Sequence, residues 1–268
     1  MTIRAVTFDF WGTLVVDGPG ADERYRAPRL RAWWRILSEA GLEVSTKALE
    51  GAYDRSMTTL HAVWRGHRDV TVDYHVEAIL AGLDPTVGAA LDHNARTALL
   101  SAYAAPCASV PPAFDRATQE VLQSLRARGY ALGIVSNVLR TPGRVLRDVL
   151  ATRGLLSFFT VSTFSDEAGW RKPAREIFAM TLDRLGVDPA AAVHVGDDEV
   201  LDVFGGREAG LGTVLVGGVS GTTASRADVT IGGLEELPEA LDRLERDRLG
   251  RPPGCSRPGA SRLSDEAS

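Results

Sequence analysis

Two groups of carboxylates have residue types and spacing that could carry chemistry. Asp9 directly follows residues 3–8, an apolar and β-branched run typical of a strand buried on both faces of a parallel sheet. Four acids fall within six residues after another apolar run, in the sequence VGDDEVLD of residues 195–202. Because open α/β sheets bind ligands beyond the carboxyl ends of their strands, we expect both groups at one edge of a sheet.

Clustered carboxylates repel one another unless a cation balances their charge. Asp9, Asp197 and the backbone carbonyl of Trp11 could supply oxygen ligands to Mg²⁺, with waters and substrate completing the octahedron. Asp202 could hold a metal-bound water or Lys172. Asp9 could also attack phosphorus or carbon and form a covalent aspartyl intermediate. The sequence therefore predicts a Mg²⁺ site beside a carboxylate nucleophile.

Lys172 stands out because the chain has only one other lysine, Lys47, among many arginines. It precedes Pro173 at the predicted start of a helix, where the helix dipole already disfavours a positive charge. Carboxylates and a bound phosphate would compensate for that charge. Ser136 and Asn137 follow a second buried strand, where a hydroxyl group and backbone N–H groups can hold oxyanions. Lys172 and Ser136 are predicted to be catalytic, and Asn137 to bind substrate.

Alternating strand and helix patterns predict the elements that position these residues. Buried strands are expected at 3–8, 130–135, 159–163, 192–195 and 213–216, with a short sixth at 229–231. Amphipathic helices are expected at 114–128, 142–152 and 173–185. This alternation predicts an α/β fold with a Rossmann-like, doubly wound parallel sheet.

A block of helices is predicted between the first two strands. Apolar residues recur at helical spacing from Leu30 to Leu37, and Ser45 has the features of an N-cap for the next helix. Two more helices are expected at 70–83 and 87–104, and no strand pattern falls between about 20 and 110.

Composition excludes several classes of function. The formal net charge of −5 does not suggest a nucleic-acid or anionic-membrane partner. Cys107 and Cys255 have neither metal-ligand spacing nor a disulfide framework. No apolar run approaches membrane-spanning length, and the first strand begins too early to leave room for a signal peptide. We therefore expect a cytoplasmic protein with a small-molecule substrate, whose oligomeric state is left open.

The stretch Asp9-Phe10-Trp11-Gly12-Thr13 resembles the first motif, Asp-x-Asp-x-Thr, of the haloacid dehalogenase-like (HAD) hydrolases. Ser136, Lys172 and the Gly-Asp-x-x-x-x-Asp form of residues 196–202 are similar to that family's other three motifs. The resemblance implies Asp9 as catalytic nucleophile, Thr13 as the residue that orients it, and Gly12 beside the ligand. It also implies that the helical block is a C1 cap over the active site.

The resemblance divides the chain into three parts. Residues 1–16 and 111–246 would form the Rossmann-like core domain, and residues 17–110 the helical cap. The final segment, 247–268, is rich in Arg, Pro, Gly and Ser and is expected to be disordered.

Trp11 departs from the family pattern, because phosphatases of the family carry their second Asp at this position. That Asp acts as a general acid, which an indole cannot replace. Among relatives with other residues there, 2-haloacid dehalogenases have an aromatic one, which fits because halide leaves without a proton. They need no metal, however, and lack the acids of residues 196–202. A phosphonate hydrolase would need a Schiff-base lysine in the cap, for which Lys47 is the only candidate.

The first choice is therefore a Mg²⁺-dependent phosphohydrolase acting on a small phosphorylated metabolite, with Trp11 also near the substrate. A 2-haloacid dehalogenase is the alternative, and a phosphonate hydrolase ranks third. A non-catalytic binding domain of the same fold also stays open, although it would not need to keep Asp9, Ser136, Lys172 and Asp197 together.

Overall fold

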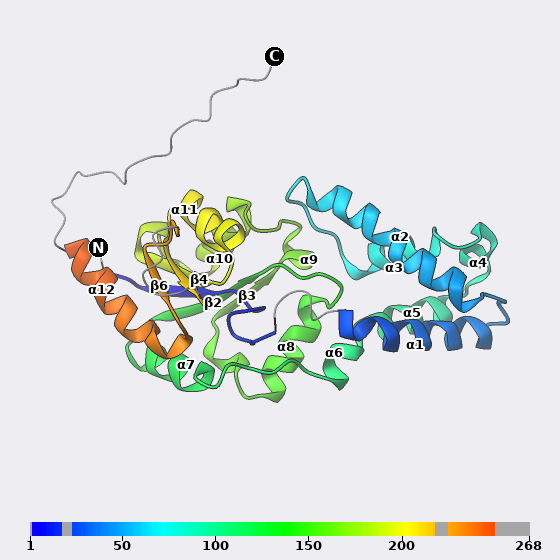
Figure 1. Cartoon of the computed structure of the whole chain (residues 1–268), viewed down its shortest axis with the longest axis horizontal. Coiled ribbons are helices and arrows are strands. Elements are labelled where there is room, and N and C mark those ends of the chain that lie inside the picture. The colour runs from blue at the N-terminus through cyan, green and yellow to red at the C-terminus, as the bar shows by residue number, and fades with distance from the viewer. Residues whose placement is uncertain (1, 18–22, 218–224, 250–268) are drawn as a thin grey trace, which may run out of the picture.

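A parallel six-stranded sheet lies at the centre of the larger part of the molecule. The computed structural model describes residues 2–17, 23–217 and 225–249. The strand order is β3-β2-β1-β4-β5-β6 (Figure 1). The strands are β1 (Ala5–Phe8), β2 (Ala131–Ser136), β3 (Val161–Phe164), β4 (Ala192–Gly196), β5 (Gly212–Val216) and β6 (Val229–Ile231). The predicted α/β class and parallel sheet are confirmed.

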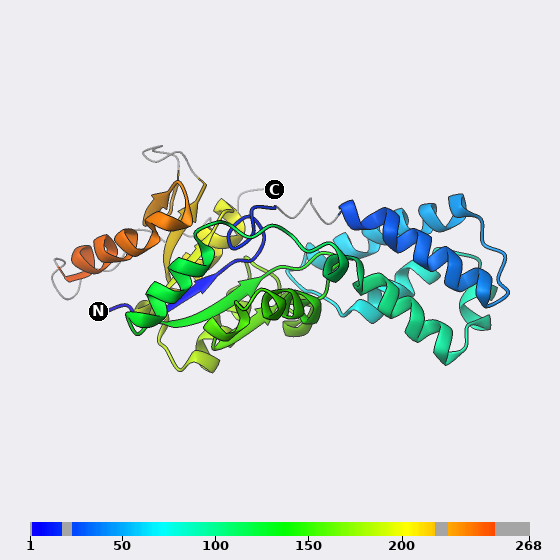
Figure 2. The ribbon, with the colours of Figure 1, turned by 90° about the horizontal axis from the view of Figure 1, so that it is seen from below.

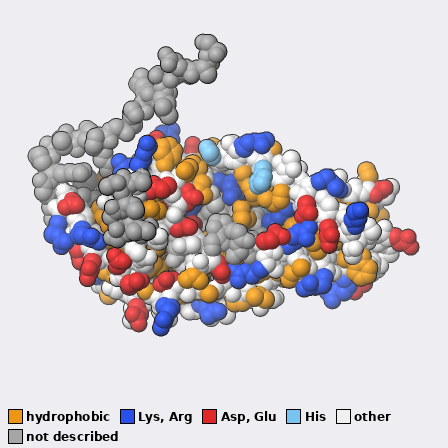
Figure 3. Space-filling model, in the orientation of Figure 1, with side chains coloured by type: hydrophobic (Ala, Val, Ile, Leu, Met, Phe, Trp, Pro, Cys, Tyr) orange, Lys and Arg blue, Asp and Glu red, His pale blue; other side chains and the backbone are white. Residues whose placement is uncertain are grey.

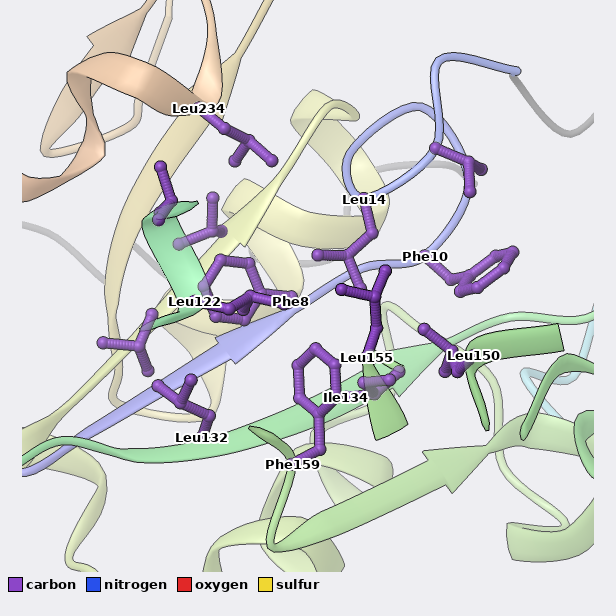
Figure 4. Packing of buried hydrophobic residues seen from close by; sticks show 14 of the residues in the cluster. Phe8, Phe10, Leu14, Leu122, Leu132, Ile134, Leu150, Leu155, Phe159 and Leu234 are labelled. Carbon is purple, nitrogen blue, oxygen red and sulfur yellow. The ribbon is translucent and has the colours of Figure 1, made fainter. Parts of the chain in front are cut away.

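Helices cover both faces of the sheet because side chains along each strand alternate between them. One face packs on α7 (Thr118–Ala127), α8 (Gly143–Thr152) and α12 (Leu237–Leu249). Phe8, Leu122 and Ile134 meet in this layer (Figure 4). The other face packs mainly on α10 (Arg175–Leu185), through a second buried cluster that includes Ala5, Ile177 and Phe178. The sheet is therefore doubly wound.

A block of helices between β1 and β2 lies at one end of the sheet (Figures 1 and 2). It contains α1 (Arg26–Glu39), α2 (Thr46–Trp64), α3 (Val72–Leu80), α4 (Pro85–Ala90) and α5 (His93–Ala104). Trp33, Leu49 and Ile79 belong to a hydrophobic cluster of its own, separate from those beside the sheet. The predicted N-cap is present, since Ser45 Oγ accepts a hydrogen bond from the N–H of Ala48.

Several predicted boundaries differ from the structure; for example, the helix predicted over 114–128 begins only at Thr118. The helix predicted over 87–104 is divided into α4 and α5, because Leu91 is extended and the Asp92 side chain caps a new helix at the N–H of Ala95. Helix α12 continues to Leu249, three residues into the segment predicted to be disordered. The rest of that segment, 250–268, lies outside the described residues.

Short elements complete the described chain. They are α6 (Pro106–Ser109), α9 (Ser165–Ala168), α11 (Gly205–Glu208), the π-helical turn η4 (Glu199–Phe204), and the 3₁₀ turns η2 (Leu156–Phe158), η3 (Pro189–Ala191) and η5 (Leu234–Glu236). Acidic and basic side chains are mixed over the face drawn in Figure 3. Within the described ranges, every helix is too short or too polar to span a membrane.

Candidate active site

The strand order brings Asp9, of the first motif, close to Asp197, of the Gly-Asp-x-x-x-x-Asp motif. Strand β1 lies between β2 and β4, and Phe8 pairs in register with both Ile134 and Val195. Asp9 and Asp197 therefore leave the sheet at the same edge, on neighbouring strands. Strands β2 and β3 are added on one side of β1, and β4, β5 and β6 on the other. The point where the strand order switches sides is where α/β folds place their ligand sites.

Lys172 joins the two carboxylates that neutralise it. Its Nζ lies 2.8 Å from Asp9 Oδ1 and 2.5 Å from Asp202 Oδ1, and all three side chains are largely removed from water. Burial alone would lower the pKa of Lys172, but the charges of Asp202 and Asp9 outweigh burial and raise it. The lysine therefore stays positively charged beside the predicted nucleophile. Burial raises the pKa of Asp9 above its usual range, against the pull of Lys172.

Asp202 is held by hydrogen bonds on both oxygens. Its Oδ1 also lies 2.9 Å from His194 Nε2, and its Oδ2 accepts the N–H of Asp198 at 3.0 Å. Although burial works in the opposite direction, Lys172 and His194 together lower the pKa of Asp202. The carboxylate is therefore charged, fixed in place, and paired with Lys172, one of the two roles predicted for it.

His194 is a residue whose contribution the sequence did not reveal. It is buried on β4. Its ring also joins Asp202 through Nε2 and lies 2.9 Å from Thr7 Oγ1 through Nδ1. The imidazole thus helps to fix the orientation of the Asp202 carboxylate, whose Oδ1 also pairs with Lys172. No pattern in the sequence distinguishes His194 from a structural histidine.

The carboxylates of Asp9, Asp197 and Asp202 could hold a metal ion, because one oxygen from each lies within 4.8 Å of the others. If all three were ionised, the ammonium group of Lys172, which pairs with Asp9 and Asp202, would balance only one of their charges. Burial and the charges of Asp9 and Asp202 raise the pKa of Asp197 to about 7. A divalent cation would relieve this repulsion, so the donor set fits Mg²⁺. Because both Asp202 oxygens already accept hydrogen bonds, Asp9 and Asp197 are the better placed ligands.

Asn137 acts on the backbone of Lys172. Its Oδ1 accepts the Lys172 N–H at 2.8 Å, and its Nδ2 donates to the Lys172 carbonyl at 3.0 Å. The side chain predicted to bind substrate therefore positions the lysine. Ser136 is fully buried at the end of β2.

Thr13 does not make the hydrogen bond expected of it, and Trp11 is buried. Thr13 Oγ1 is buried and has no hydrogen-bond partner among the described residues, so the predicted bond from Thr13 to Asp9 is not formed. A buried hydroxyl without a hydrogen-bond partner is costly, and a bound oxyanion or water would satisfy it.

Trp11 is 3% exposed, and its indole packs edge-on against Phe10, with ring centroids 5.1 Å apart. Its role in substrate binding stays a prediction.

Gly12 leaves no room for a side chain. Its φ is +73°, and a Cβ would lie 2.3 Å from Asp197 Oδ2. Replacing Gly12 with Ala is therefore expected to displace the Asp197 carboxylate and lower turnover at least about tenfold. Gly41 is the matched control, because it has a φ of +74° and nothing within 4 Å. Gly41→Ala should cost about 1–2 kcal/mol of stability through backbone strain and leave turnover unchanged. Equal turnover in the two variants, measured at saturating substrate, would contradict this reading of Gly12.

Comparison with known proteins gives the family. Residues 3–210 match the profile of the haloacid dehalogenase-like hydrolases. The chain belongs to this family. The match covers both the helical block and the first four strands, so the HAD resemblance suggested by the motifs is confirmed at the level of the family.

Curated HAD relatives include phosphatases and proteins named only for their domain. The chain is 28% identical over 258 residues to human haloacid dehalogenase-like hydrolase domain-containing protein 3, covering 93% of this chain and 88% of that protein. It is 31% identical over 217 residues to a glyceraldehyde 3-phosphate phosphatase of Methanopyrus kandleri, covering 80% and 84%. The alignment with the bovine domain-containing protein 3 spans 51% of that relative, at 34% identity.

Solved HAD structures share the fold. A HAD phosphatase from Thermococcus onnurineus is 28% identical with a TM-score of 0.57, covering 89% of this chain and 98% of that chain. A 2-haloacid dehalogenase from Pseudomonas syringae has a TM-score of 0.67 at 24% identity, covering 91% and 100%. A putative HAD-hydrolase from Bacillus subtilis, bound to magnesium, has a TM-score of 0.55 at 18% identity, covering 90% and 100%.

Proposed function

We propose that this HAD-family chain is a Mg²⁺-dependent phosphohydrolase acting on a small phosphorylated metabolite. The observation that carries the proposal is the convergence of Asp9, Lys172 and Asp197 at the carboxyl edge of the sheet. A nucleophilic carboxylate, a fixed ammonium group and a further acid are the groups that phosphoryl transfer needs for attack and charge neutralisation. The relatives named as glyceraldehyde 3-phosphate phosphatases favour a small sugar phosphate.

The reaction proceeds in two steps. The Asp9 carboxylate attacks phosphorus, the bond to the leaving oxygen breaks, and an aspartyl phosphate forms while the alkoxide or aryloxide takes a proton from water. Water then attacks the phosphorus, releasing inorganic phosphate and restoring Asp9. Lys172 balances the charge at Asp9 throughout, and Asp202 holds Lys172 in position. Bound Mg²⁺ would be held by Asp9 and Asp197 and would neutralise charge on the phosphoryl oxygens.

The proposal is tested by assaying phosphate release and halide release in parallel, each with Mg²⁺ and with excess EDTA. The substrates are an aryl phosphate, small sugar phosphates and a 2-haloacid. We expect phosphate release that requires Mg²⁺. Phosphate or metal binding without turnover of any substrate would instead indicate a non-catalytic domain.

Dehalogenation is the second candidate because of Trp11 alone. An aromatic residue at this position fits a halide leaving group, which needs no proton. Halide release that continues in EDTA would replace the phosphohydrolase with this activity. The acids Asp197 and Asp202 favour the metal-dependent reaction.

Trp11 predicts a steep dependence of rate on the leaving group. The indole is buried against Phe10 and cannot donate a proton as a general acid. The leaving group must therefore depart with its oxygen unprotonated. Aryl or acyl phosphates should be cleaved about 10²–10⁴ times faster than alkyl phosphates. A Brønsted series of phosphate esters measures this dependence. A rate that is insensitive to leaving-group pKa would mean that another residue supplies the proton.

Trp11→Asp is the complementary variant. It should flatten the leaving-group dependence if the new carboxyl group reaches the leaving oxygen. Because the indole belongs to the core cluster, this variant should also lose on the order of 3–5 kcal/mol of stability. Urea denaturation separates that loss from the kinetic effect.

Stabilisation by Mg²⁺ should increase with pH. With a pKa of about 7, Asp197 in the metal-free folded state keeps a proton that the unfolded chain loses near pH 4. This group therefore lowers the stability of the metal-free protein as pH rises between those values. Mg²⁺ must displace that proton below pH 7, so its effect on the melting temperature should be larger at pH 8 than at pH 5.5. Asp197→Asn should remove the difference, and equal shifts at both pH values in the parent would count against Asp197 as a ligand.

A further inference from the structure

A loop of the helical block lies directly against the segment that precedes Lys172. Residues 65–71 connect α2 to α3 on the block side. The N–H of Arg171 donates to the carbonyl of His67 at 2.9 Å, and the N–H of Asp69 donates to the carbonyl of Gly169 at 3.2 Å. The block therefore contacts the core through backbone hydrogen bonds next to the lysine.

Asp69 is the centre of this contact. Its side chain is 1% exposed, and both carboxylate oxygens are used. Oδ2 accepts hydrogen bonds from Ser165 Oγ at 2.5 Å and Arg171 Nη1 at 2.6 Å. Oδ1 accepts from Trp64 Nε1 and from the N–H of Val70, both at 2.8 Å. The Asp69 carboxylate is thus fixed by two donors from its own block, on Oδ1, and by two donors from the core, on Oδ2.

The core partners of Asp69 in turn hold the loops that carry catalytic residues. Ser165 Oγ accepts the N–H of Val138 at 2.9 Å, and Arg171 Nη1 donates to the Val138 carbonyl at 2.5 Å. Val138 follows Asn137, whose side-chain amide forms two hydrogen bonds with the Lys172 backbone. Hydrogen bonds therefore run from Asp69 to both the Asn137 loop and the Lys172 segment.

Two cation–π contacts join the same loop and the end of α2 to the segment before Lys172. The Arg171 guanidinium lies 4.3 Å from the centre of the Trp64 ring, and the Arg68 guanidinium lies 3.8 Å from that of Trp170. Arg171 and Asp69 are both buried, so the loss of either charge would leave the other without compensation.

We propose that Asp69 is a positioning residue. Through it, the geometry of the Asn137 loop and the Lys172 segment depends on contact between the helical block and the core. With Asp69 in place, the Asn137 loop and the Lys172 segment are locked together; with the block displaced, Arg171 and Ser165 lose the acceptor that orders them. This inference rests on the proposed function for its kinetic consequence, but its structural consequence can be measured without any substrate.

The kinetic test compares two Asp→Asn variants of the full-length protein. Asp69→Asn should lower kcat about 10–100-fold, as loss of an outer partner of a catalytic group typically does, and change KM less than about threefold. Asp54→Asn is the matched control, because Asp54 pairs with Arg26 at 2.9 Å within the block and is exposed. It should leave kcat within about twofold of the parent.

The structural test is hydrogen exchange of the same three proteins, read by mass spectrometry. Asp69→Asn should speed exchange in peptides covering 136–140 and 169–173, where the Val138, Arg171 and Lys172 amides are bonded. Peptides of β5 should be unchanged, as should all peptides in Asp54→Asn. A purely structural loss of stability would instead speed exchange throughout the chain.

Ser165→Ala gives a second variant that does not alter a charge. It should reproduce the faster exchange at 136–140, and adding it to Asp69→Asn should lower kcat by less than the product of the single effects. Unchanged exchange in both catalytic loops would overturn the inference, as would a kcat for Asp69→Asn within threefold of an active parent. A parent inactive on every substrate would overturn the proposed function, and the exchange measurements would still decide the role of Asp69.

Discussion

Replacing Asp9 with Asn is expected to lower turnover by roughly 10³-fold or more, because it removes the proposed covalent nucleophile. The fold should persist, since Asn occupies nearly the same volume and Lys172 keeps its ion pair with Asp202. Turnover is measured on the best substrate of the parent at saturating concentration, and circular dichroism checks the fold. Asp148→Asn, an exposed substitution on α8, is the control and should retain full activity.

Residual activity of Asp9→Asn above about a tenth of the parent would be too large for the loss of a nucleophile. That result would assign the attacking group elsewhere. A single-turnover experiment then offers a direct check, because only the parent should accumulate a phosphoryl group on the protein.

Replacing Lys172 with Met is expected to cost about 3–5 kcal/mol of stability in addition to activity. The substitution leaves the carboxylates of Asp9 and Asp202 buried without their shared cation, and an uncompensated buried charge is strongly destabilising. Urea denaturation at pH 7.5 in EDTA measures this loss directly. Met keeps the length of the side chain, so a cavity contributes little.

The double variant Lys172→Met/Asp202→Asn separates charge from packing. Removing one of the two stranded carboxylates should recover part of the lost stability and none of the activity. If the double variant is less stable than the single one by the full cost of Asp202→Asn alone, the two residues do not interact energetically. The ion pair would then be of no consequence for folding.

Local patterns in the sequence predicted most of the fold. Apolar and β-branched runs of four to six residues located five buried strands, because a strand covered on both faces must be apolar along its length. A run of three residues, 229–231, located the sixth. Helix boundaries were less certain where capping competes with periodicity, as at Asp92, which starts α5 inside a continuous predicted helix. That cap is a short-range feature that the apolar stripe obscures.

The sequence also predicted the residues that converge at the site, but not what each contacts. Asp9 and Asp197 were identifiable because each follows an apolar run typical of a buried strand, and Lys172 because lysine is rare in this chain. The sequence did not predict that Asn137 would hold the Lys172 backbone, that Thr13 would lack a partner, or that the Trp11 indole would be buried.

Tertiary structure alone decided the roles of His194 and Asp69. A histidine on a buried strand and an aspartate in a loop between helices carry no pattern that distinguishes them from structural residues. Their importance comes from partners brought close by folding: Asp202 beside the His194 ring, and Ser165 and Arg171 around a carboxylate about a hundred residues earlier in the chain. Periodicity reports which face of an element is buried, whereas a hydrogen bond between distant segments depends on how those elements pack, and only the folded chain contains that information.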